Sequence, residues 1–289
     1  MMTAANRKAL GWQAWYAMRR DRLLIVSATL LALIVVAVII GPWLTPHSYQ
    51  TMDLSAVLLS PQWADYRWFG TDDLGRDLFA RVMQGGRISL MVGIVSTFVS
   101  LVVGVLYGAT AGYFGGRIDH LMMRFVDILY ALPFMFFVIL LMVLFGRNIL
   151  LIFVAIGAVN WLDMARIVRG QTLALRRREY VEAAEMAGAY SRRVIFRHIV
   201  PNLLGVVVVY ATLTVPQVIL IESFLSFIGL GVQEPMTSWG ALVQRGTELM
   251  SIAPWVLVIP SVMLAVSLLC LNFVGDGLRD ALDPKDGHR

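Results

Sequence analysis

The feature that most constrains this chain is a series of apolar stretches that contain no charged residue. A helix needs roughly 20 apolar residues to cross the hydrocarbon core of a bilayer. Backbone groups cannot hydrogen-bond to lipid, so spanning segments are helices or closed barrels, and the alternating ten-residue strands of a barrel are absent. The sequence therefore predicts an all-α integral membrane protein with six transmembrane helices. They fall at 23–44, 88–116, 128–146, 148–162, 199–221 and 249–275, the fourth being the shortest.

The composition agrees with this assignment. Hydrophobic residues make up 58% of the chain and charged residues 15%, whereas soluble domains have about 45–50% and about 25%. A soluble globule, a disordered chain and a collagen are excluded. The single cysteine, Cys270, excludes an intrachain disulfide and is expected to fill space in the core. The first stretch is longer than the apolar region of a signal peptide, about 7–15 residues, which favours a retained span over a cleaved one.

The distribution of basic residues predicts the orientation. With a cytoplasmic N-terminus, eighteen of the 24 Lys and Arg residues fall on the inner side, which is a clear positive-inside pattern. The net charge of +5 is therefore read as a topology signal and not as a nucleic-acid footprint. Both termini are expected in the cytoplasm. The expected segments are an inner arm (1–22), the first span (23–44), an outer segment (45–87), a five-helix core (88–275) with an inner loop (174–200), and an inner tail (276–289).

The outer segment contains three aspartates within the run from Gly70 to Asp77. A calcium loop would need oxygen ligands at alternating positions and a closing glutamate, which this run lacks. The favoured interpretation is that Thr71 or Asp72 caps a short helix that begins near Leu74.

The inner loop predicts two short helices. The run from Glu179 to Ala187 is rich in strong helix formers, and Gly188 suits the left-handed position that ends a helix. Ser191 is placed to cap a second helix that runs towards Pro201. An amphipathic helix on lipid headgroups is one alternative. The acids and the small alanines of the first helix instead favour docking of another protein.

Several catalytic classes find no support in the sequence. The only lysines are Lys8 and Lys285, and neither precedes Ser or Thr, so the chain lacks a P-loop for ATP. The four histidines form no metal-binding pattern, and no nucleophile elbow is present. A passive channel would need a filter. The run Gly229-Leu230-Gly231 could be imagined as one, but such a run more often marks the end of a helix.

The spacing of Glu182-Ala183-Ala184, Gly188 and Pro201 resembles the "EAA" loop of ABC importer permeases. Where the family pattern has an isoleucine three residues before the proline, this chain has His198. Further stretches are similar to the C-type permeases of the oligopeptide and dipeptide family. These stretches are 70–77, 133–138, 161–171, 222–231 and 275–284.

The resemblance implies a type I ABC importer permease in a bacterial inner membrane, with cytoplasmic coupling helices and no cofactor, metal or ATP site of its own. It implies four kinds of partner: a homologous B-type permease, two ATPase subunits of the D and F types, a periplasmic binding protein and a peptide substrate. A dipeptide, nickel or glutathione importer of the same family is the alternative, and a passive channel or membrane scaffold is the alternative outside it. The implied coupling residues are Glu182, Ala183, Ala184, Met186, Gly188, Ala189 and Pro201.

A few charged residues lie close to or within the predicted spans. Arg124 with Asp127, and Asp163 with Arg166, are spaced three residues apart and are expected to pair along a helix. Glu222 has no basic residue within four positions. Because an unpaired charge in a membrane is costly, Glu222 is a candidate for the outer mouth or gate of a pathway.

Overall fold

The computed structural model describes residues 21–146 and 149–282, and the regular structure in these ranges is helical apart from one isolated bridge between Thr71 and Asp77. Most of the arm 1–22 and the end of the tail 276–289 lie outside the described residues. The α-helices are α2 (Arg22–Ile40), α3 (Leu78–Phe114), α4 (Gly116–Ala131), α5 (Phe134–Phe145), α6 (Ile149–Arg176), α7 (Glu179–Met186), α8 (Ser191–Val194), α9 (Val200–Phe227), α10 (Trp239–Leu249) and α11 (Pro254–Leu282).

The prediction of an all-helical membrane protein is confirmed. Four helices are long and apolar enough to cross a membrane, at Arg22–Trp43, Leu78–Phe114, Ser191–Phe227 and Pro254–Ala281. The predicted third span is broken, because α4 and α5 meet at an angle of 85° and count as one further span only if taken together. The predicted fourth span belongs to α6, which is not among the four. The count of six therefore stays a prediction.

Several predicted boundaries are wrong at the outer side. Helix α3 begins at Leu78 and not at Ile88, so the helix starts within the predicted outer segment 45–87. The reason is that charged residues can belong to a helix when their charges are bonded: Arg87 Nε, in α3, donates to the carbonyl oxygen of Val38 at 2.9 Å. The amphipathic helix α10 was also missed; Ser238 caps it by accepting a hydrogen bond from the Ala241 amide.

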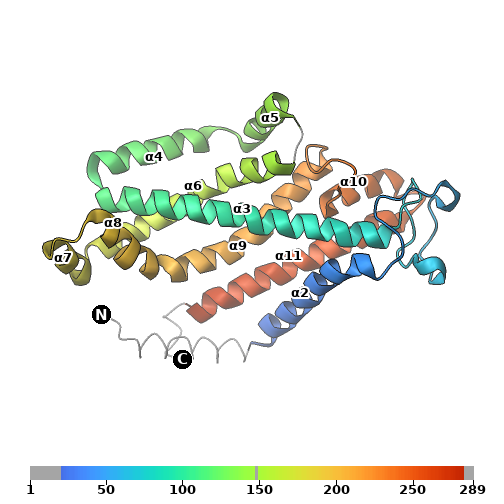
Figure 1. Cartoon of the computed structure of the whole chain (residues 1–289), viewed down its shortest axis with the longest axis horizontal. Coiled ribbons are helices and arrows are strands. Elements are labelled where there is room, and N and C mark those ends of the chain that lie inside the picture. The colour runs from blue at the N-terminus through green and yellow to red at the C-terminus, as the bar shows by residue number, and fades with distance from the viewer. Residues whose placement is uncertain (1–20, 147–148, 283–289) are drawn as a thin grey trace.

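Helix α3 runs along the long axis of the molecule and touches most of the other helices (Figure 1). Its most extensive partner is α6. Three glycines, spaced four residues apart, face α6 at this contact: Gly104, Gly108 and Gly112. A Cβ on Gly104 would lie 2.6 Å from Met164 Cβ, and one on Gly108 would clash with the backbone oxygen of Ala165. Small residues at this spacing let two membrane helices pack backbone against backbone.

The outer segment is a compact loop held by its own polar groups. Thr71 Oγ1 donates to the Ala56 carbonyl at 2.6 Å and accepts from the Leu59 amide at 2.8 Å. Gly75 has φ +72°, and a Cβ there would clash with the Asp53 carbonyl. The predicted cap is therefore wrong: Thr71 organises the loop, and Asp77 caps α3 by accepting from the Ala80 amide at 2.9 Å.

We expect Gly108→Ala to lower the thermal stability of the purified protein, because a methyl group cannot fit against the Ala165 carbonyl without moving α6. Overpacking of this kind costs about 1–3 kcal/mol. Gly205→Ala in α9 is the matched control, since a Cβ there has no atom within 4 Å. Thermal unfolding in detergent measures both. Equal stability of Gly108→Ala and the parent would contradict close packing of α3 on α6.

Candidate coupling site and outer polar cluster

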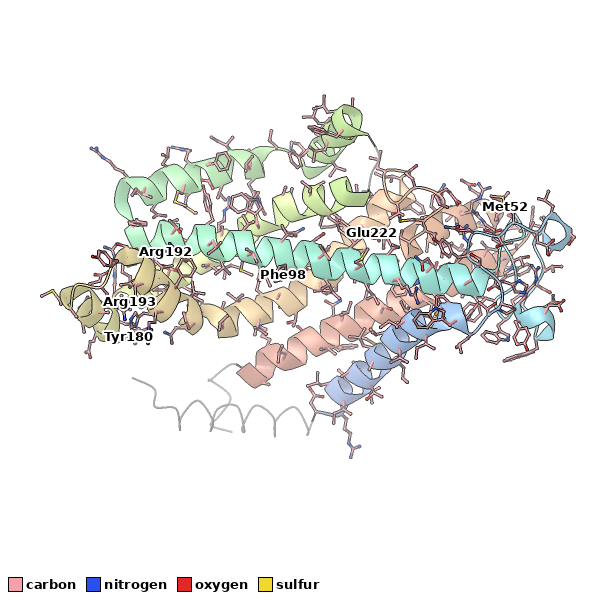
Figure 2. All side chains as sticks on the ribbon, viewed as in Figure 1. Met52, Phe98, Tyr180, Arg192, Arg193 and Glu222 are labelled. Atoms are coloured by element: carbon pink, nitrogen blue, oxygen red, sulfur yellow. The ribbon has the colours of Figure 1, made fainter. Side chains whose placement is uncertain are left out.

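The inner loop forms a projection at one end of the long axis, opposite the outer segment (Figure 1). Helix α7 ends at Met186, the chain turns at Gly188, and α8 begins at Ser191. Figure 2 shows Tyr180, Arg192 and Arg193 gathered at this end. The prediction of two short helices with a bend at Gly188 therefore agrees with the structure, although Ser191 lies inside the second helix and does not cap it.

The bend has a specific hydrogen-bond pattern. Gly188 has φ +81°. Its amide donates to the Glu185 carbonyl at 2.9 Å, and the Ala189 amide donates to the Ala184 carbonyl at 3.0 Å. These two bonds are those of a Schellman motif, in which the left-handed residue is usually glycine. No heavy atom lies within 4 Å of a Cβ built on Gly188, so only its backbone conformation requires glycine there.

The underside of the coupling segment, here defined as residues 179–201, is anchored in an apolar cluster. Val181, Val194 and Ile199 are fully buried. They pack with Tyr113 of α3 and Val168 of α6, among other residues. Burying each such side chain stabilises the fold by about 1.5–3 kcal/mol. The base of the coupling segment is therefore packed against α3 and α6.

A π-helical turn, Ile195–Ile199, joins α8 to α9. A π turn inserts one residue into a helix and changes which side chains face the core. His198, at the position where the family has isoleucine, is half-buried, and its neighbour Ile199 occupies the core. Pro201 lies in the first turn of α9, where a proline is tolerated.

The side chains of the coupling segment that do not pack in the apolar cluster are largely exposed, and they form its tip. Met186 is 89% exposed and Tyr190 is 85% exposed. Glu182, Ala183 and Gly188 are exposed as well, whereas Ala184 and Ala189 are half-buried. An open hollow of about 840 Å³ lies beside them. It is lined by Tyr190, Arg192, Arg193, Phe196, Arg197 and Pro201.

The ion pairs near the inner ends of the spans form between helices, so the expected pairs along single helices are wrong. Arg166 of α6 donates to Asp127 of α4 at 2.8 Å. Arg169 of α6 binds both carboxylate oxygens of Asp119, a buried residue of α4, at 2.5 and 2.6 Å. A bidentate guanidinium–carboxylate pair fixes orientation as well as distance. These pairs hold α4 against α6.

Glu222, whose position is labelled in Figure 2, is fully buried and bonded to serine hydroxyls. Ser226 Oγ, one turn further along α9, donates to Glu222 Oε1 at 2.7 Å. Ser89 Oγ of α3 donates to Oε2 at 3.1 Å. Ser89 Oγ also accepts from the amide of Trp239 in α10 at 3.2 Å. The carboxyl group thus links three helices and does not open onto the described surface.

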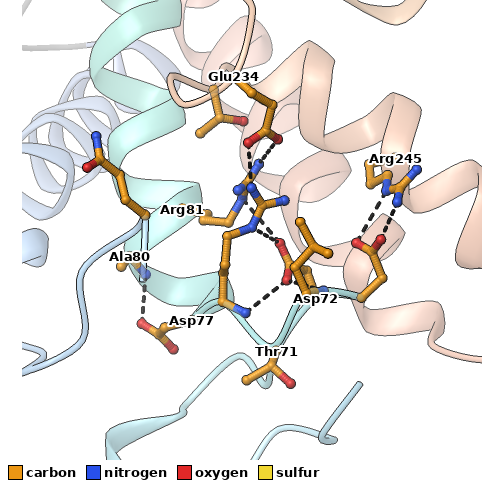
Figure 3. Close-up of polar contacts among 12 residues, drawn as sticks. Thr71, Asp72, Asp77, Ala80, Arg81, Glu234 and Arg245 are labelled. Atoms are coloured by element: carbon orange, nitrogen blue, oxygen red, sulfur yellow. Dashed lines mark hydrogen bonds and ion pairs between the residues drawn. The ribbon is translucent and has the colours of Figure 1, made fainter. Parts of the chain in front are cut away.

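A second polar cluster at the outer end was not predicted. Arg76 and Arg81 are 3% exposed, and both contact Glu234 in the loop between α9 and α10 (Figure 3). Burial raises the pKa of Glu234, but the hydrogen bonds and charges of these arginines outweigh it and lower the pKa overall. The sequence does place these two arginines close to a short acidic run. The positive-inside count used them only to predict orientation and did not consider which carboxylates they bind.

Within residues 21–146 and 149–282, no group of three His, Cys, Asp or Glu side chains is arranged to hold a metal ion.

The run 229–231 ends a helix, as expected. At the outer end of α9, Gly229 has φ +81° and its amide donates to the Ser226 carbonyl.

Comparison with known families gives a match over most of the chain. Residues 76–286 match the family described as the binding-protein-dependent transport system inner membrane component. The chain belongs to this family. Residues 10–61 match a second description, the N-terminal TM domain of oligopeptide transport permease C. The coupling segment and the outer cluster both lie within the first match.

Curated relatives share this family. The chain is 55% identical over 280 residues to the oligopeptide transport system permease protein OppC of Escherichia coli K12, covering 96% of this chain and 93% of that protein. It is 54% identical to the OppC protein of Haemophilus influenzae, covering 92% and 86%. It is 45% identical to the dipeptide transport system permease protein DppC of Bacillus subtilis, covering 94% and 85%.

A solved structure shares the fold of this permease. An inward-facing form of the MetNI methionine ABC transporter aligns with a TM-score of 0.56 and 20% identity, covering 70% of this chain and 96% of that one. The likeness supports the type I permease fold of the family.

We expect Glu222→Gln to stay close to the parent in thermal stability, because an amide still bonds to the hydroxyls of Ser89 and Ser226. Glu222→Leu leaves those buried hydroxyls without their carboxyl partner, and an unsatisfied buried group costs about 1–3 kcal/mol. Thermal unfolding of the purified permease compares the two. Equal losses in both variants would contradict the hydrogen-bonding role of this side chain.

Proposed function

We propose that this chain is a transmembrane permease subunit of an ATP-driven oligopeptide importer and forms half of its translocation pathway. The family match and the relatives at 54% and 55% identity support this proposal. A dipeptide importer is the second candidate, because a dipeptide permease is 45% identical. A passive channel is disfavoured by the family match, and no ATP-binding motif is present in the sequence.

The observation that carries the mechanism is the coupling segment, a projection with an exposed top and a buried base. We propose that its top contacts the ATPase subunits through Glu182, Ala183, Ala184, Met186, Gly188 and Ala189, with Pro201 at its far end. Met186 and Tyr190 are 89% and 85% exposed. Large apolar side chains exposed together at a tip are typical of a protein contact. The small alanines beside them allow a partner to approach closely.

The packing contacts at the base of the segment can transmit a displacement of its tip to the membrane helices. Helix α8, the π turn and α9 form one continuous span, Ser191–Phe227. Val181 and Val194 pack in the same cluster as Tyr113 of α3. A displacement of the tip by closing ATPases is therefore passed to α3, α6 and α9 together, because packed interiors move as units. In this account the pathway switches between inward-facing and outward-facing states as these helices tilt.

The exposed sides of the helices supply surfaces for the remaining partners. Helix α3 exposes several large apolar side chains, including Ile94 and Phe98, at 60% and 64%. Figure 2 labels Phe98 on this helix. We propose that surfaces of this kind face lipid and a homologous B-type permease. A periplasmic binding protein would deliver peptide at the opposite end from the coupling segment.

Glu222 enters this account as part of the outer gate. Its carboxyl group links α3, α9 and α10, so a gate formed by these helices depends on it indirectly. Direct contact with peptide is disfavoured by its complete burial.

We expect Gly188→Val to insert into the membrane normally but to lose peptide uptake. A β-branched residue at φ +81° is strained by about 1–3 kcal/mol, and the strain falls on the bend and not on the spans. Gly188→Asn is the matched control, because asparagine tolerates this conformation. Uptake in whole cells is measured beside pull-down of the ATPases.

Glu182→Lys tests the same contact by charge. Glu182 is exposed, so reversing its charge should leave the fold intact while weakening ATPase binding. Ser251→Ala, at an exposed site in the turn between α10 and α11, should change neither. Normal uptake by both Gly188→Val and Glu182→Lys would overturn the assignment of the coupling segment.

The proposed orientation has its own test. With Cys270 replaced by alanine, single cysteines are placed at Ser55, Ala174 and Ser251, all of which are exposed. An impermeant thiol reagent should label positions 55 and 251 from outside, and position 174 only after the membrane is opened. The basic residues flanking the inner loop motivate this expectation. Labelling of position 174 in intact cells would reverse the orientation.

A further inference from the structure

The outer polar cluster contains guanidinium N–H donors that have no acceptor in the described structure. Arg76 Nε donates to Asp72 Oδ2 at 2.7 Å, and Arg76 Nη1 donates to Glu234 Oε2 at 2.5 Å. Arg81 Nη2 donates to Glu234 Oε1 at 3.1 Å. A guanidinium has five N–H donors. In the described structure, however, Arg81 Nε and Nη1 are buried without a hydrogen-bond partner.

Asp72 forms an ion pair with Arg81 but does not complete its hydrogen bonding. Asp72 Oδ2 lies 3.5 Å from Arg81 Nε, which is longer than an ordinary hydrogen bond. The Asp72 carboxylate already accepts from the amides of Leu74 and Arg76 and from the Arg76 side chain. Leaving a charged donor buried and unbonded is costly. The Nε and Nη1 groups of Arg81 are therefore free to bind a further acceptor if the site has space for one.

A cavity of about 620 Å³ opens at this place. Its volume falls in the range of small-ligand pockets, about 300–1,000 Å³. Arg76, Arg81, Arg245 and Glu234 line its charged part, and Gln244 contributes an amide. Arg245 is already paired with Asp73 and Glu248. The apolar part is lined by Met52, Leu74, Val232 and Met236. A pocket with a cationic end and an apolar wall suits a short ligand that has a carboxylate and small side chains.

The Glu234 side chain is the member of this site that another carboxylate can displace. It is 60% exposed, whereas the side chains of Arg76 and Asp72 are both 3% exposed. It sits on the α9–α10 loop and binds both guanidiniums, and Figure 3 shows its carboxylate facing Arg81. A second carboxylate can occupy the same positions and bridge the two guanidiniums with one oxygen on each, as Glu234 does.

We propose that this outer pocket binds a carboxylate group of a peptide, with Arg81 and Arg76 as its receptors and Glu234 as an internal ligand that the peptide displaces. The peptide nature of the ligand rests on the proposed function. The receptor chemistry rests on the bonds of both arginines to the exposed Glu234, on the unsatisfied donors of Arg81, and on the cavity beside them. The carboxylate can belong to the C-terminus or to an acidic side chain.

The test uses the complete transporter in detergent, without its binding protein, and radiolabelled trialanine in equilibrium dialysis. Trialanine amide, which lacks the carboxylate, should bind about tenfold more weakly, as expected for the loss of a charge-assisted contact. Arg81→Gln should reduce the affinity for trialanine to that for the amide. Glu234→Gln should increase the affinity for trialanine, because the internal competitor loses its charge, and should leave the amide unaffected.

Controls separate this site from folding and from general charge. Arg279→Gln removes a positive charge at an exposed position near the end of α11 and should change neither affinity. If Arg81→Gln does not assemble, Glu234→Gln decides, because misfolding cannot increase affinity. A blocked peptide with one central aspartate, acetyl-Ala-Asp-Ala-amide, assigns the source: binding equal to trialanine indicates any carboxylate, and weak binding indicates the terminus.

Equal binding of trialanine and its amide, or unchanged or weakened binding of trialanine in Glu234→Gln, would overturn the proposal, as would no binding of either peptide to that variant. The same preparation reports on the proposed function separately. If the ATPases copurify and peptide uptake is intact while these affinities do not respond, the pocket fails and the importer assignment stands. If uptake and ATPase binding are absent in the parent, the importer assignment fails.

Discussion

The structure depends on the close packing of α3 against its neighbours. In a membrane, helices gain little from burying apolar surface, so tight van der Waals contact has to replace it. Gly104, Gly108 and Gly112 provide that contact by letting α6 approach the backbone of α3. Helix α3 then reaches from the outer polar cluster, where Asp77 caps it, to the base of the coupling segment, where Tyr113 packs. One helix therefore joins the two ends at which partners are expected.

This arrangement gives the two ends different properties. The inner end has an apolar base and an exposed tip, which suits its proposed role of transmitting force from a partner that it can release. The outer end is held by charges: Arg76 and Arg81 join the start of α3 to the α9–α10 loop, and Arg245 of α10 binds Asp73. Burial raises the pKa of Asp73, but the hydrogen bond and charge of Arg245 outweigh it and lower the pKa overall.

Much of the fold could be predicted because a membrane excludes charge so strongly. Uncharged runs located α2, α9 and α11, and the left-handed bend at Gly188 followed from the chemistry of glycine alone. The boundaries failed where tertiary contacts satisfy charges or polar groups. Arg87 lies within α3 because it bonds to the end of α2, and Thr71 serves the outer loop instead of a helix cap. Two further features could not be predicted from local sequence patterns, because they depend on contacts between distant segments. They are the break between α4 and α5 and the pairing of Arg169 with Asp119.

In the proposed mechanism, the tip of the coupling segment touches the ATPase subunits and moves with them. The most direct measurement is cross-linking from a single cysteine at Met186, in a protein whose Cys270 is replaced, using a short thiol-to-amine reagent in membranes that contain the whole transporter. The account predicts a product with an ATPase subunit whose yield changes when ATP is added, and no such product from a cysteine at Ser251. Absence of an ATPase product from position 186, or equal products from both positions, would contradict it.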